Sequence, residues 1–361
     1  MRVLVITPWL PTRKKPATGT FTVRDIELLR RDHEVTVFHL AAPGDLTPEE
    51  TPAAGTIRQP YNFKSPRSSL AATRQIRKML PEYDLVHTMA MSALFPTAMA
   101  RPTIPWVHTE HFSDLVNPGL PWHRKALLAA LSTFYRFPSA SVAVGKDLAA
   151  VIDKHRTQET SVIGNYVNFP AQVTDRTPRQ DPRLLAVGGL IHRKGPLESV
   201  QTLAELHDKG VHATLTWVGS GPLKDQVQTL ARRLSVEEFL HLPGFVDPGV
   251  LSRYFEEADL FFLPTEAETF GVVFAEALAH GLPVVTTGVG GHTDFLPPNA
   301  SRVADNRRPE TLATAIQDLL GDPQKPSRSR ISREAARVFS EEERRVQYAN
   351  VYAQASSQTG P

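Results

Sequence analysis

Short apolar runs alternate with amphipathic stretches along the whole chain, which is the pattern of parallel strands joined by crossover helices. The first repeat has a strand at residues 3–7, a long polar loop to Gly19, a helix over 20–31 and a second strand at 33–39. Further strands are predicted at 84–87, 105–108, 141–144, 183–188, 213–218, 239–242, 260–263 and 283–286. We therefore expect an α/β protein built from two doubly wound, Rossmann-like domains.

Chain length and one polar segment place the expected domain boundary. A chain of 361 residues is longer than one hydrophobic core usually supports. Residues 171–182 are polar and contain proline, which is typical of a linker. We expect domains at 1–170 and 171–339, with a cleft between the carboxyl ends of their strands. The amphipathic stretch 121–136 is interpreted as a packed helix first and a membrane-facing helix second.

Charge is nearly balanced in total but unevenly distributed. The formal net charge is +2, yet residues 1–170 carry 20 Lys and Arg against 14 Asp and Glu. An anionic acceptor or an anionic membrane surface could contact this basic half, although an ordinary solvated face is the favoured interpretation. The basic clusters are Arg13-Lys14-Lys15 and Lys64, Arg67, Arg74, Arg77 and Lys78.

Features that the sequence lacks also narrow the class of protein. There are no cysteines, which excludes disulfides and thiolate metal sites. The apolar run at the N-terminus is too short for a signal peptide, and no stretch is long enough to span a membrane. We therefore expect a soluble, cytoplasmic protein.

The segment 268–276 carries the strongest chemical signal. Glu268 lies in the loop after the strand at 260–263, and Glu276 lies inside the helix that follows. Eight residues separate them, so they cannot contact one atom, but they suit an elongated ligand with hydroxyl pairs at both ends. Amide groups at the helix start, from Phe270, Gly271 and Val272, would stabilise a phosphate or a sugar oxygen between them. A sugar nucleotide has these parts in this order.

Other glycine-rich loops follow strands of the second half. Residues 188–195 include Arg193 and Lys194, which could neutralise a diphosphate, although a glycine turn with solvated cations would look the same. The turns at 219–222 and 288–292 are individually weak, and the dinucleotide fingerprint is incomplete because Lys224 replaces its third glycine. Four such loops at one end of a sheet are hard to explain by packing alone.

In the first half, two loops should face the same cleft. Gly19 opens the first helix, and His108 to His111 follow a strand. Two histidines with Glu110 between them invite a metal interpretation, but no other cluster offers converging ligands. His87 is more simply a buried histidine with its hydrogen bonds satisfied. The chain also contains no Asp-x-Asp motif. Such a motif usually binds the divalent ion that bridges the phosphates of a sugar nucleotide.

These segments together resemble the GT-B fold, retaining glycosyltransferases of family GT4, the glycosyl transferases of group 1. Glu268 and Glu276 resemble the family's E-x7-E signature. Residues 188–195 resemble its phosphate loop, and residues 219–222 resemble its G-x-G-P turn. Residues 242–247 resemble the segment beside the nucleobase, and 165–168 resemble the end of the first domain. Residues 339–341 resemble the start of a closing helix, which implies that 340–361 cross back to the N-terminal domain.

The resemblance implies a role for each matched residue. Lys194 would stabilise the leaving diphosphate, Glu268 would contact the donor sugar, and His111 would contact that sugar from the other domain. Glu276 would hold the ribose hydroxyls. The implied catalytic residues are Lys194, Glu268 and His111, and the implied donor-binding residues are Gly19, Gly189, Arg193, Lys194, Gly219, Phe245, Val246, Glu268, Phe270, Gly271, Val272 and Glu276. No metal and no cofactor are implied.

The implied reaction transfers a hexosyl group, with retention, from a nucleotide sugar to an acceptor hydroxyl. UDP is the expected nucleotide, the C-terminal domain would bind the donor, and the N-terminal domain would bind the acceptor. The acceptor is unidentified, and lipid-linked, phosphorylated and soluble acceptors all stay open; no nucleic acid is expected. The alternatives are an epimerase or phosphorylase on the same fold, or a sugar-nucleotide sensor whose catalysis has decayed.

Three departures from the family pattern bear on these roles. Gly189 stands where the family usually has a phosphate-binding arginine, so either Arg193 substitutes or the grip is weaker. Tyr166 replaces a common glycine, and Asn168 replaces a common aspartate.

Overall fold

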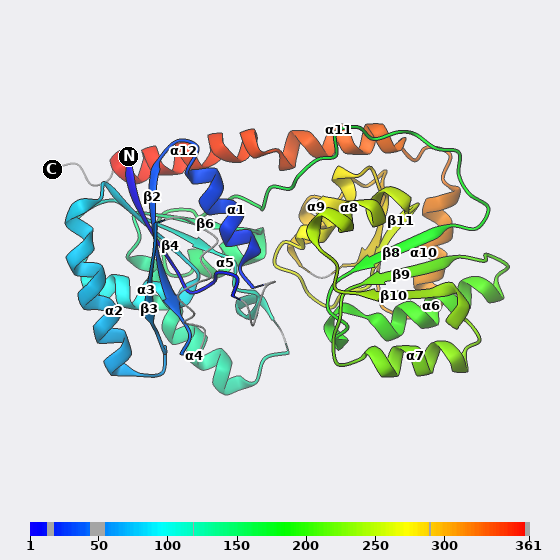
Figure 1. Ribbon diagram of the computed structural model, residues 1–361, viewed down its shortest axis with the longest axis horizontal. Helices are drawn as coiled ribbons and strands as arrows, with labels where there is room; N and C mark the ends of the chain where they lie inside the picture. The colour runs from blue at the N-terminus through cyan, green and yellow to red at the C-terminus, as the bar shows by residue number, and fades with distance from the viewer. Residues whose placement is uncertain (13–17, 44–54, 118, 289, 358–361) are drawn as a thin grey trace. The chain divides into compact units, whose positions relative to one another are not determined.

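The computed structural model describes residues 1–12, 18–43, 55–117, 119–288 and 290–357. The chain forms two compact units, one of Met1–Asn165 with Glu341–Pro361 and one of Tyr166–Ser340 (Figure 1). The polar segment 171–182 therefore lies inside the second unit. The basic residues Arg13 to Lys15 lie outside the described residues.

The first unit is built on a parallel sheet. Its described strands have the order β3-β2-β1-β4-β5-β6-β7, and every pairing between neighbours is parallel. The strands of the centre are buried on both faces, with Val3 to Ile6 of β1 fully inaccessible, as parallel sheets require. The strands are β1 (Arg2–Thr7), β2 (Glu34–Ala41), β3 (Thr56–Pro60), β4 (Leu85–Met89), β5 (Trp106–Glu110), β6 (Ala140–Ala143) and β7 (Ser161–Val162).

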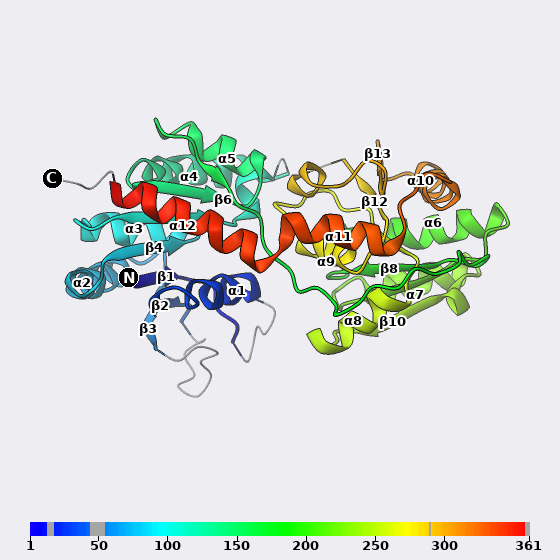
Figure 2. The same ribbon diagram turned by 90° about the horizontal axis from the view of Figure 1, so that it is seen from above.

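Helices cover this sheet, and the last helix of the chain is one of them. Helices α2 and α3 pack side by side, whereas α12 packs against α1 and over β5 and β6 (Figure 2). The return of the chain's end to the first unit was predicted and is confirmed by this packing. The helices are α1 (Thr20–Leu29), α2 (Pro66–Met79), α3 (Met91–Ala100), α4 (Trp122–Ser132), α5 (Lys146–Asp153) and α12 (Glu341–Ser357).

The second unit repeats the design with a smaller parallel sheet. Its described strands have the order β10-β9-β8-β11-β12-β13. They are β8 (Arg183–Val187), β9 (Thr214–Val218), β10 (Leu240–Gly244), β11 (Leu260–Leu263), β12 (Val284–Thr287) and β13 (Ser301–Ala304). The helices are α6 (Pro196–Asp208), α7 (Lys224–Arg233), α8 (Pro248–Glu257), α9 (Val272–Ala279), α10 (Pro309–Gly321) and α11 (Arg328–Phe339). The predicted fold class of two Rossmann-like domains is confirmed.

One helix differs from its prediction. The stretch 121–136 was expected to pack against the protein, but in α4 only Ser132 is buried, and Trp122 and Leu127 are 80% and 50% exposed. The stretch breaks at Thr133 into a short 3-10 helix, which buries Tyr135 instead. The packed interpretation of α4 is therefore wrong. Among the described residues, no helix is both long and apolar enough to cross a bilayer.

Candidate functional site

The site in the second unit forms where the direction of strand order reverses. Strand β8 lies between β9 and β11, so the loops that follow β8 and β11 leave the sheet side by side and diverge. Ligands of open α/β sheets bind in the crevice at this point. Lys194 belongs to the first of these loops and Glu268 to the second.

Glu268 and Lys194, which are 74 positions apart, are in direct contact. Lys194 Nζ lies 2.5 Å from Glu268 Oε1, and Arg193 Nη1 lies 3.3 Å from the same oxygen. The Thr265 hydroxyl also donates to this oxygen at 3.0 Å. Burial would raise the pKa of the Glu268 carboxyl, but the Lys194 and Arg193 charges and the hydrogen bonds from Lys194 and Thr265 outweigh it and lower that pKa. Glu268 is therefore an ionised carboxylate in a largely dry setting.

Backbone contacts hold the two loops together. The carbonyl of Arg193 accepts from the Glu266 amide at 2.7 Å and from the Thr265 hydroxyl at 3.2 Å. The Arg193 guanidinium donates to the Ala267 carbonyl as well as to Glu268. Arg193 is thus a brace between the loops, and its cation is already engaged by Glu268.

Helix α9 begins directly after Glu268. Gly271 precedes it with φ +74°, and a Cβ there would come within 2.6 Å of the Phe274 ring, so glycine is required. No side chain caps the helix, and the amides of Val272 and Val273 lack intrahelical acceptors by helix geometry. Glu276 lies one turn further along the helix and is half-buried.

The Phe270 side chain is buried and fixes the turn that precedes α9. It is 4% exposed, and its ring centroid lies 4.8 Å from that of Phe295 and 6.1 Å from that of Phe339. The Phe295 and Phe339 centroids are 4.9 Å apart. We call these three rings the aromatic trio. It leaves only the Phe270 backbone for a ligand.

Glycines of the neighbouring turn are needed for packing. A Cβ on Gly219 would lie 2.0 Å from the Gly188 carbonyl oxygen, and one on Gly221 would lie 2.5 Å from the Leu190 carbonyl oxygen. The Leu190 amide donates to the Ser220 carbonyl at 3.1 Å. The turn 219–222 therefore fits tightly against the loop after β8, which accounts for its glycines without a ligand.

Gly189 differs from these glycines. Its φ is not positive, and the nearest atom to a Cβ would be the Ser220 carbonyl oxygen at 3.6 Å, an ordinary contact. A side chain at 189 would therefore fit without strain. At the end of β10, Phe245 is 60% exposed and Val246 is half-buried, so an apolar surface is available beside the sheet.

Residues predicted in the first unit lie at the carboxyl ends of β1 and β5. Gly19 has φ +73°, and a Cβ there would lie 2.5 Å from the Trp9 carbonyl oxygen. His111 is 8% exposed, its Nε2 lies 3.4 Å from Asp25 Oδ2, and its ring is tilted by 35° against the Phe21 ring with the centroids 4.6 Å apart. Phe21 and Asp25 are four residues apart on α1 and so present one helix face to His111.

The other predicted histidines have structural partners. Glu110 Oε1 accepts from the amides of His111 and Phe112 at 2.9 and 3.0 Å, and its Oε2 accepts from the Tyr135 hydroxyl at 2.7 Å. His108 Nε2 lies 3.2 Å from the same Oε2. No group of three metal-ligating side chains occurs among the described residues, and the metal alternative for this segment has no structural support.

His87 is buried and satisfied, as the sequence indicated. Its Nδ1 lies 2.8 Å from the Tyr352 hydroxyl, and its Nε2 lies 2.7 Å from Thr109 Oγ1. Burial lowers the pKa of His87 to about 3, so the ring is neutral.

Three contributors were not identified from the sequence. Asp25 beside His111 and Thr265 beside Glu268 are buried polar residues that only the tertiary fold brings to these sites. His292 is fully buried, stacks on Phe274 at 4.5 Å, and its Nε2 lies 3.1 Å from the Thr287 carbonyl. The glycine pair before His292 was a signal for this loop, but nothing in the sequence indicated that the ring is buried.

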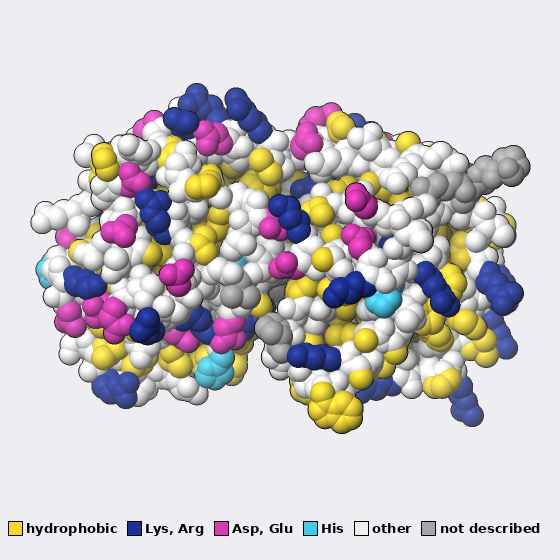
Figure 3. Space-filling model, turned by 180° about the vertical axis from the view of Figure 1, so that it is seen from behind, with side chains coloured by type: hydrophobic (Ala, Val, Ile, Leu, Met, Phe, Trp, Pro, Cys, Tyr) yellow, Lys and Arg dark blue, Asp and Glu magenta, His cyan; other side chains and the backbone are white. Residues whose placement is uncertain are grey.

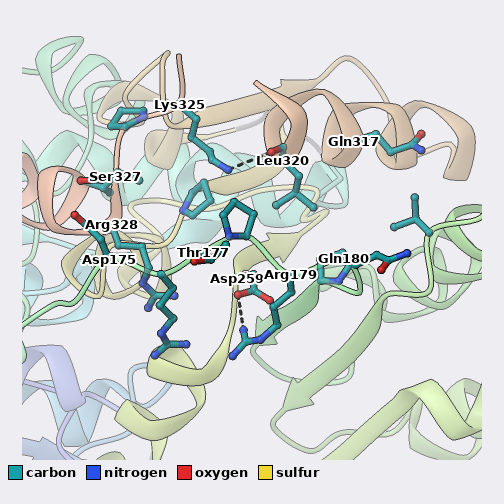
Figure 4. Close-up of a pocket in the computed structure, with 17 residues that line it drawn as sticks. Asp175, Thr177, Arg179, Gln180, Asp259, Gln317, Leu320, Lys325, Ser327 and Arg328 are labelled. Carbon is teal, nitrogen blue, oxygen red and sulfur yellow. Dashed lines mark hydrogen bonds and ion pairs between the residues drawn. The ribbon is translucent and has the colours of Figure 1, made fainter. Parts of the chain in front are cut away.

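A cavity of about 480 Å³ in the second unit lies at the opposite edge of its sheet, beside the starts of β8, β11 and β12 (Figure 4). Three of the cations that line it have partners: Arg179 Nη1 is 2.5 Å from Asp259 Oδ1, Lys325 Nζ donates to the Leu320 carbonyl at 3.3 Å, and Arg328 donates to the carbonyls of Ala258 and His280. These bonds hold the ends of α8, α9 and α10. The contact between Lys194 and Glu268 lies at the other, carboxyl edge of the sheet.

On the face in Figure 3, basic and acidic side chains are interspersed over the second unit, whereas basic side chains predominate on the lower part of the first unit (Figure 3).

Comparison with known proteins identifies the family of the chain. The model of the family described as "Glycosyltransferase Family 4" matches residues 26–169, and that of "Glycosyl transferases group 1" matches 173–338. A GDP-mannose-dependent alpha-(1-6)-phosphatidylinositol dimannoside mannosyltransferase of Mycobacterium tuberculosis is 32% identical over 228 residues, 58% of each chain. The match thus spans little more than half of that relative.

Solved structures share the fold at low identity. The apo form of the lipopolysaccharide outer core galactosyltransferase WaaB has a TM-score of 0.80 at 14% identity, over 97% of this chain and 99% of that one. Anabaena HepE in complex with UDP and glucose has a TM-score of 0.72 at 19% identity, over 98% and 99%. The chain therefore belongs to the group 1 glycosyltransferases of family GT4, and its two Rossmann-like units are those of the GT-B fold.

Proposed function

We propose that this protein transfers a hexosyl group from a nucleotide sugar to an acceptor hydroxyl, with retention at the anomeric carbon. The observation that carries the proposal is the buried contact between Lys194 and Glu268 at the switch point of the second sheet. A sugar-nucleotide sensor that has lost its catalysis would not need the Lys194 ammonium fixed in a largely buried loop. The second unit would bind the donor, the first unit would bind the acceptor, and a movement of the two units toward each other would bring the substrates together.

The donor would extend along α9. Its diphosphate would lie beside Lys194 and the unbonded amides at the start of the helix, where the positive end of the helix stabilises negative charge. The ribose hydroxyls would bind Glu276, and the base would lie against Phe245 and Val246. In the other direction the sugar would reach Glu268 and, after closure, His111.

Lys194 is proposed to act on the leaving group. When the bond from the sugar to the diphosphate breaks, negative charge builds on the departing phosphate oxygen, and a positioned ammonium stabilises that charge. Glu268 holds Lys194 in place and would accept hydrogen bonds from the sugar hydroxyls. The acceptor oxygen would attack from the face that the leaving group vacates, and its proton would pass to the departing phosphate. Metal-independent transfer is expected, because these groups supply the positive charge.

The nucleotide is proposed to be UDP, and GDP-mannose is a second candidate. HepE was solved with UDP, whereas the mycobacterial relative is named GDP-mannose-dependent. The deciding experiment is a panel of UDP-, GDP-, ADP- and dTDP-sugars, with nucleotide release measured in the presence of chelator. NMR of the product gives its anomeric configuration. Nucleotide sugars that neither bind nor turn over would overturn the proposal.

A lipid-linked acceptor and peripheral membrane contact are proposed for the first unit. Exposed Trp122 and Leu127 lie on α4, which also carries Lys125 and Arg124, the latter paired with Asp114 at 2.9 Å. Aromatic and basic side chains together suit an anionic membrane surface. The test is sedimentation with phosphatidylglycerol vesicles. Trp122→Ser with Leu127→Ser should abolish co-sedimentation, and equal binding by the double variant would contradict it.

A further inference from the structure

The cavity of about 480 Å³ beside the starts of β8, β11 and β12 is separate from the proposed donor site (Figure 4). One wall is the segment 175–182, and another runs from the end of α10 to the start of α11. Lys194 and Glu268 are not among its lining residues and lie at the other edge of the sheet. The volume falls within the ~300–1,000 Å³ typical of small-molecule sites.

Cations outnumber carboxylates around this cavity. Four cationic side chains line it against two carboxylates, a formal excess of two positive charges. The cations are Arg176, Arg179, Lys325 and Arg328, and the carboxylates are Asp175 and Asp259.

Both carboxylates are already engaged. Asp259 Oδ1 pairs with Arg179 Nη1 at 2.5 Å, and its Oδ2 accepts from the Arg183 amide at 2.9 Å. Asp175 accepts from the amide and the hydroxyl of Ser329, at 2.8 and 3.0 Å, and so caps the start of α11. In the part of the chain that the structure describes, the other three cations of the cavity form no ion pair.

Neutral carbonyls hold two of these three cations. Arg328 donates to the carbonyls of Ala258 and His280 at 2.6 and 3.1 Å, and Lys325 donates to that of Leu320 at 3.3 Å. A carbonyl group has no net charge, so these bonds fix the side chains and leave their positive charge unpaired.

The remaining positive charges lie close enough to interact. Burial and the nearby Arg176 charge lower the pKa of Arg328 to about 10. Arg176 is exposed and forms no hydrogen bond among the described residues, so its guanidinium is free to bind a ligand. An anion placed among these side chains would offset their mutual repulsion.

The neutral part of the wall indicates what else the ligand carries. The side chains of Thr177, Gln180 and Gln317 line the cavity and make no hydrogen bond among the described residues (Figure 4). A hydroxyl and two amides can each donate to and accept from the hydroxyl groups of a ligand. The ligand therefore has a polar, uncharged portion beside its anionic group.

We propose that this cavity binds a phosphate monoester of a small hydroxylated molecule, with its phosphate beside Arg176 and Arg328. Planar guanidinium groups bind phosphate oxygens through paired hydrogen bonds. A phosphate monoester carries a charge of roughly −1.5 to −2 at neutral pH, which matches the excess of positive charge. The site goes beyond the proposed function and does not depend on it, because no residue of the proposed donor site takes part.

The test is calorimetric titration of the full chain, at constant ionic strength, with glucose 6-phosphate, glycerol 3-phosphate and AMP. At least one of the three should bind saturably. Glucose should not bind, and inorganic phosphate should bind about tenfold more weakly than the best monoester, because it leaves the neutral wall without a partner.

Variants separate charge from shape. Arg176→Glu should weaken the best monoester by about tenfold or more, since it replaces a charged donor by a like charge. Thr177→Trp, a change in an exposed segment, fills the cavity with all the cations still in place and should weaken binding as much. Arg330→Ala removes a cation of α11 that does not line the cavity, and this control should bind like the wild type.

Repeating the titrations with saturating UDP or GDP, and with Lys194→Met, identifies any binding at the donor site. Monoester binding that these leave unchanged and that Arg176→Glu removes would support the cavity site, even if no nucleotide sugar binds or reacts. The proposal would be overturned if none of the three monoesters bound saturably, or if Arg176→Glu bound like the wild type. Loss of binding in Lys194→Met, or inorganic phosphate that binds as tightly as every monoester, would overturn it too.

Discussion

The ion pair between Lys194 and Glu268 makes a quantitative prediction about stability. At 2.5 Å and an effective dielectric constant of about 20, the two charges attract by about 7 kcal/mol before desolvation is subtracted. Their side chains are only 13% and 9% exposed, so solvent screens this attraction little. Replacing Lys194 by Met leaves the Glu268 carboxylate buried, with Arg193 at 3.3 Å as the remaining cation.

Breaking one side of a buried pair costs about 3–5 kcal/mol, and the residual Arg193 contact favours the lower end. We therefore expect Lys194→Met to reduce the free energy of unfolding by about 3 kcal/mol. For a domain of this size that corresponds to a loss of roughly 6–12 °C in Tm. Lys194→Met with Glu268→Gln should recover most of this loss, because no buried carboxylate is then left without its ammonium and the remaining Arg193 side chain is 35% exposed, but neither variant should transfer sugar.

Calorimetric unfolding of the four members of this double-mutant cycle measures the coupling, which should be about 2–3 kcal/mol. Arg330→Met removes an exposed pair with Glu334 in the same unit and is the matched control, with an expected change under about 0.5 kcal/mol. A Lys194→Met protein as stable as the wild type, with no coupling to position 268, would refute the reasoning.

Other predictions concern binding and pH. Glu276→Ala should weaken nucleotide affinity by about 1–3 kcal/mol in calorimetric titration, since a charged acceptor of hydroxyls is lost; unchanged UDP and GDP affinity would remove Glu276 from the ribose site. Gly189→Arg should fold normally, because its Cβ has room, and should bind diphosphate more tightly; weaker UDP binding would contradict this. His87 has a folded pKa of about 3 against 6.5 unfolded, so its stabilising effect is present above pH 6.5 and is lost as pH falls from there toward 3, by ~1.4 kcal/mol per unit. His87→Asn should flatten that part of the stability curve, and an unchanged slope would show that other groups dominate it.

Much of the fold could be predicted because its elements carry local signals. The strand at 260–263 is an apolar run closed by Pro264, and Gly271 precedes the helix that begins at Val272. Elements without such signals were not predicted. Strand β3 is an edge strand of mostly polar, half-exposed residues, and α3 contains Pro96, which ordinarily argues against a helix.

The site was only partly predictable, for a different reason. The spacing of Glu268 and Glu276 is local, and so is the Arg193-Lys194 pair. That Lys194 meets Glu268 depends on which strands are neighbours, and that Asp25 approaches His111 depends on how α1 packs. Gly219 shows the opposite error. The sequence suggested a ligand-binding turn there, but the structure explains this glycine by its close contact with Gly188.

The aromatic trio has a consequence beyond local packing. Phe339 is the last residue of α11, and its carbonyl accepts from the Val167 amide at 3.1 Å, where the chain enters and leaves the second unit. Its ring contacts the rings of Phe295 and Phe270. The Phe270 backbone belongs to the loop before α9 that is proposed to bind the sugar. A ligand that shifts the Phe270 backbone would therefore also displace the two segments by which the chain enters and leaves the second unit.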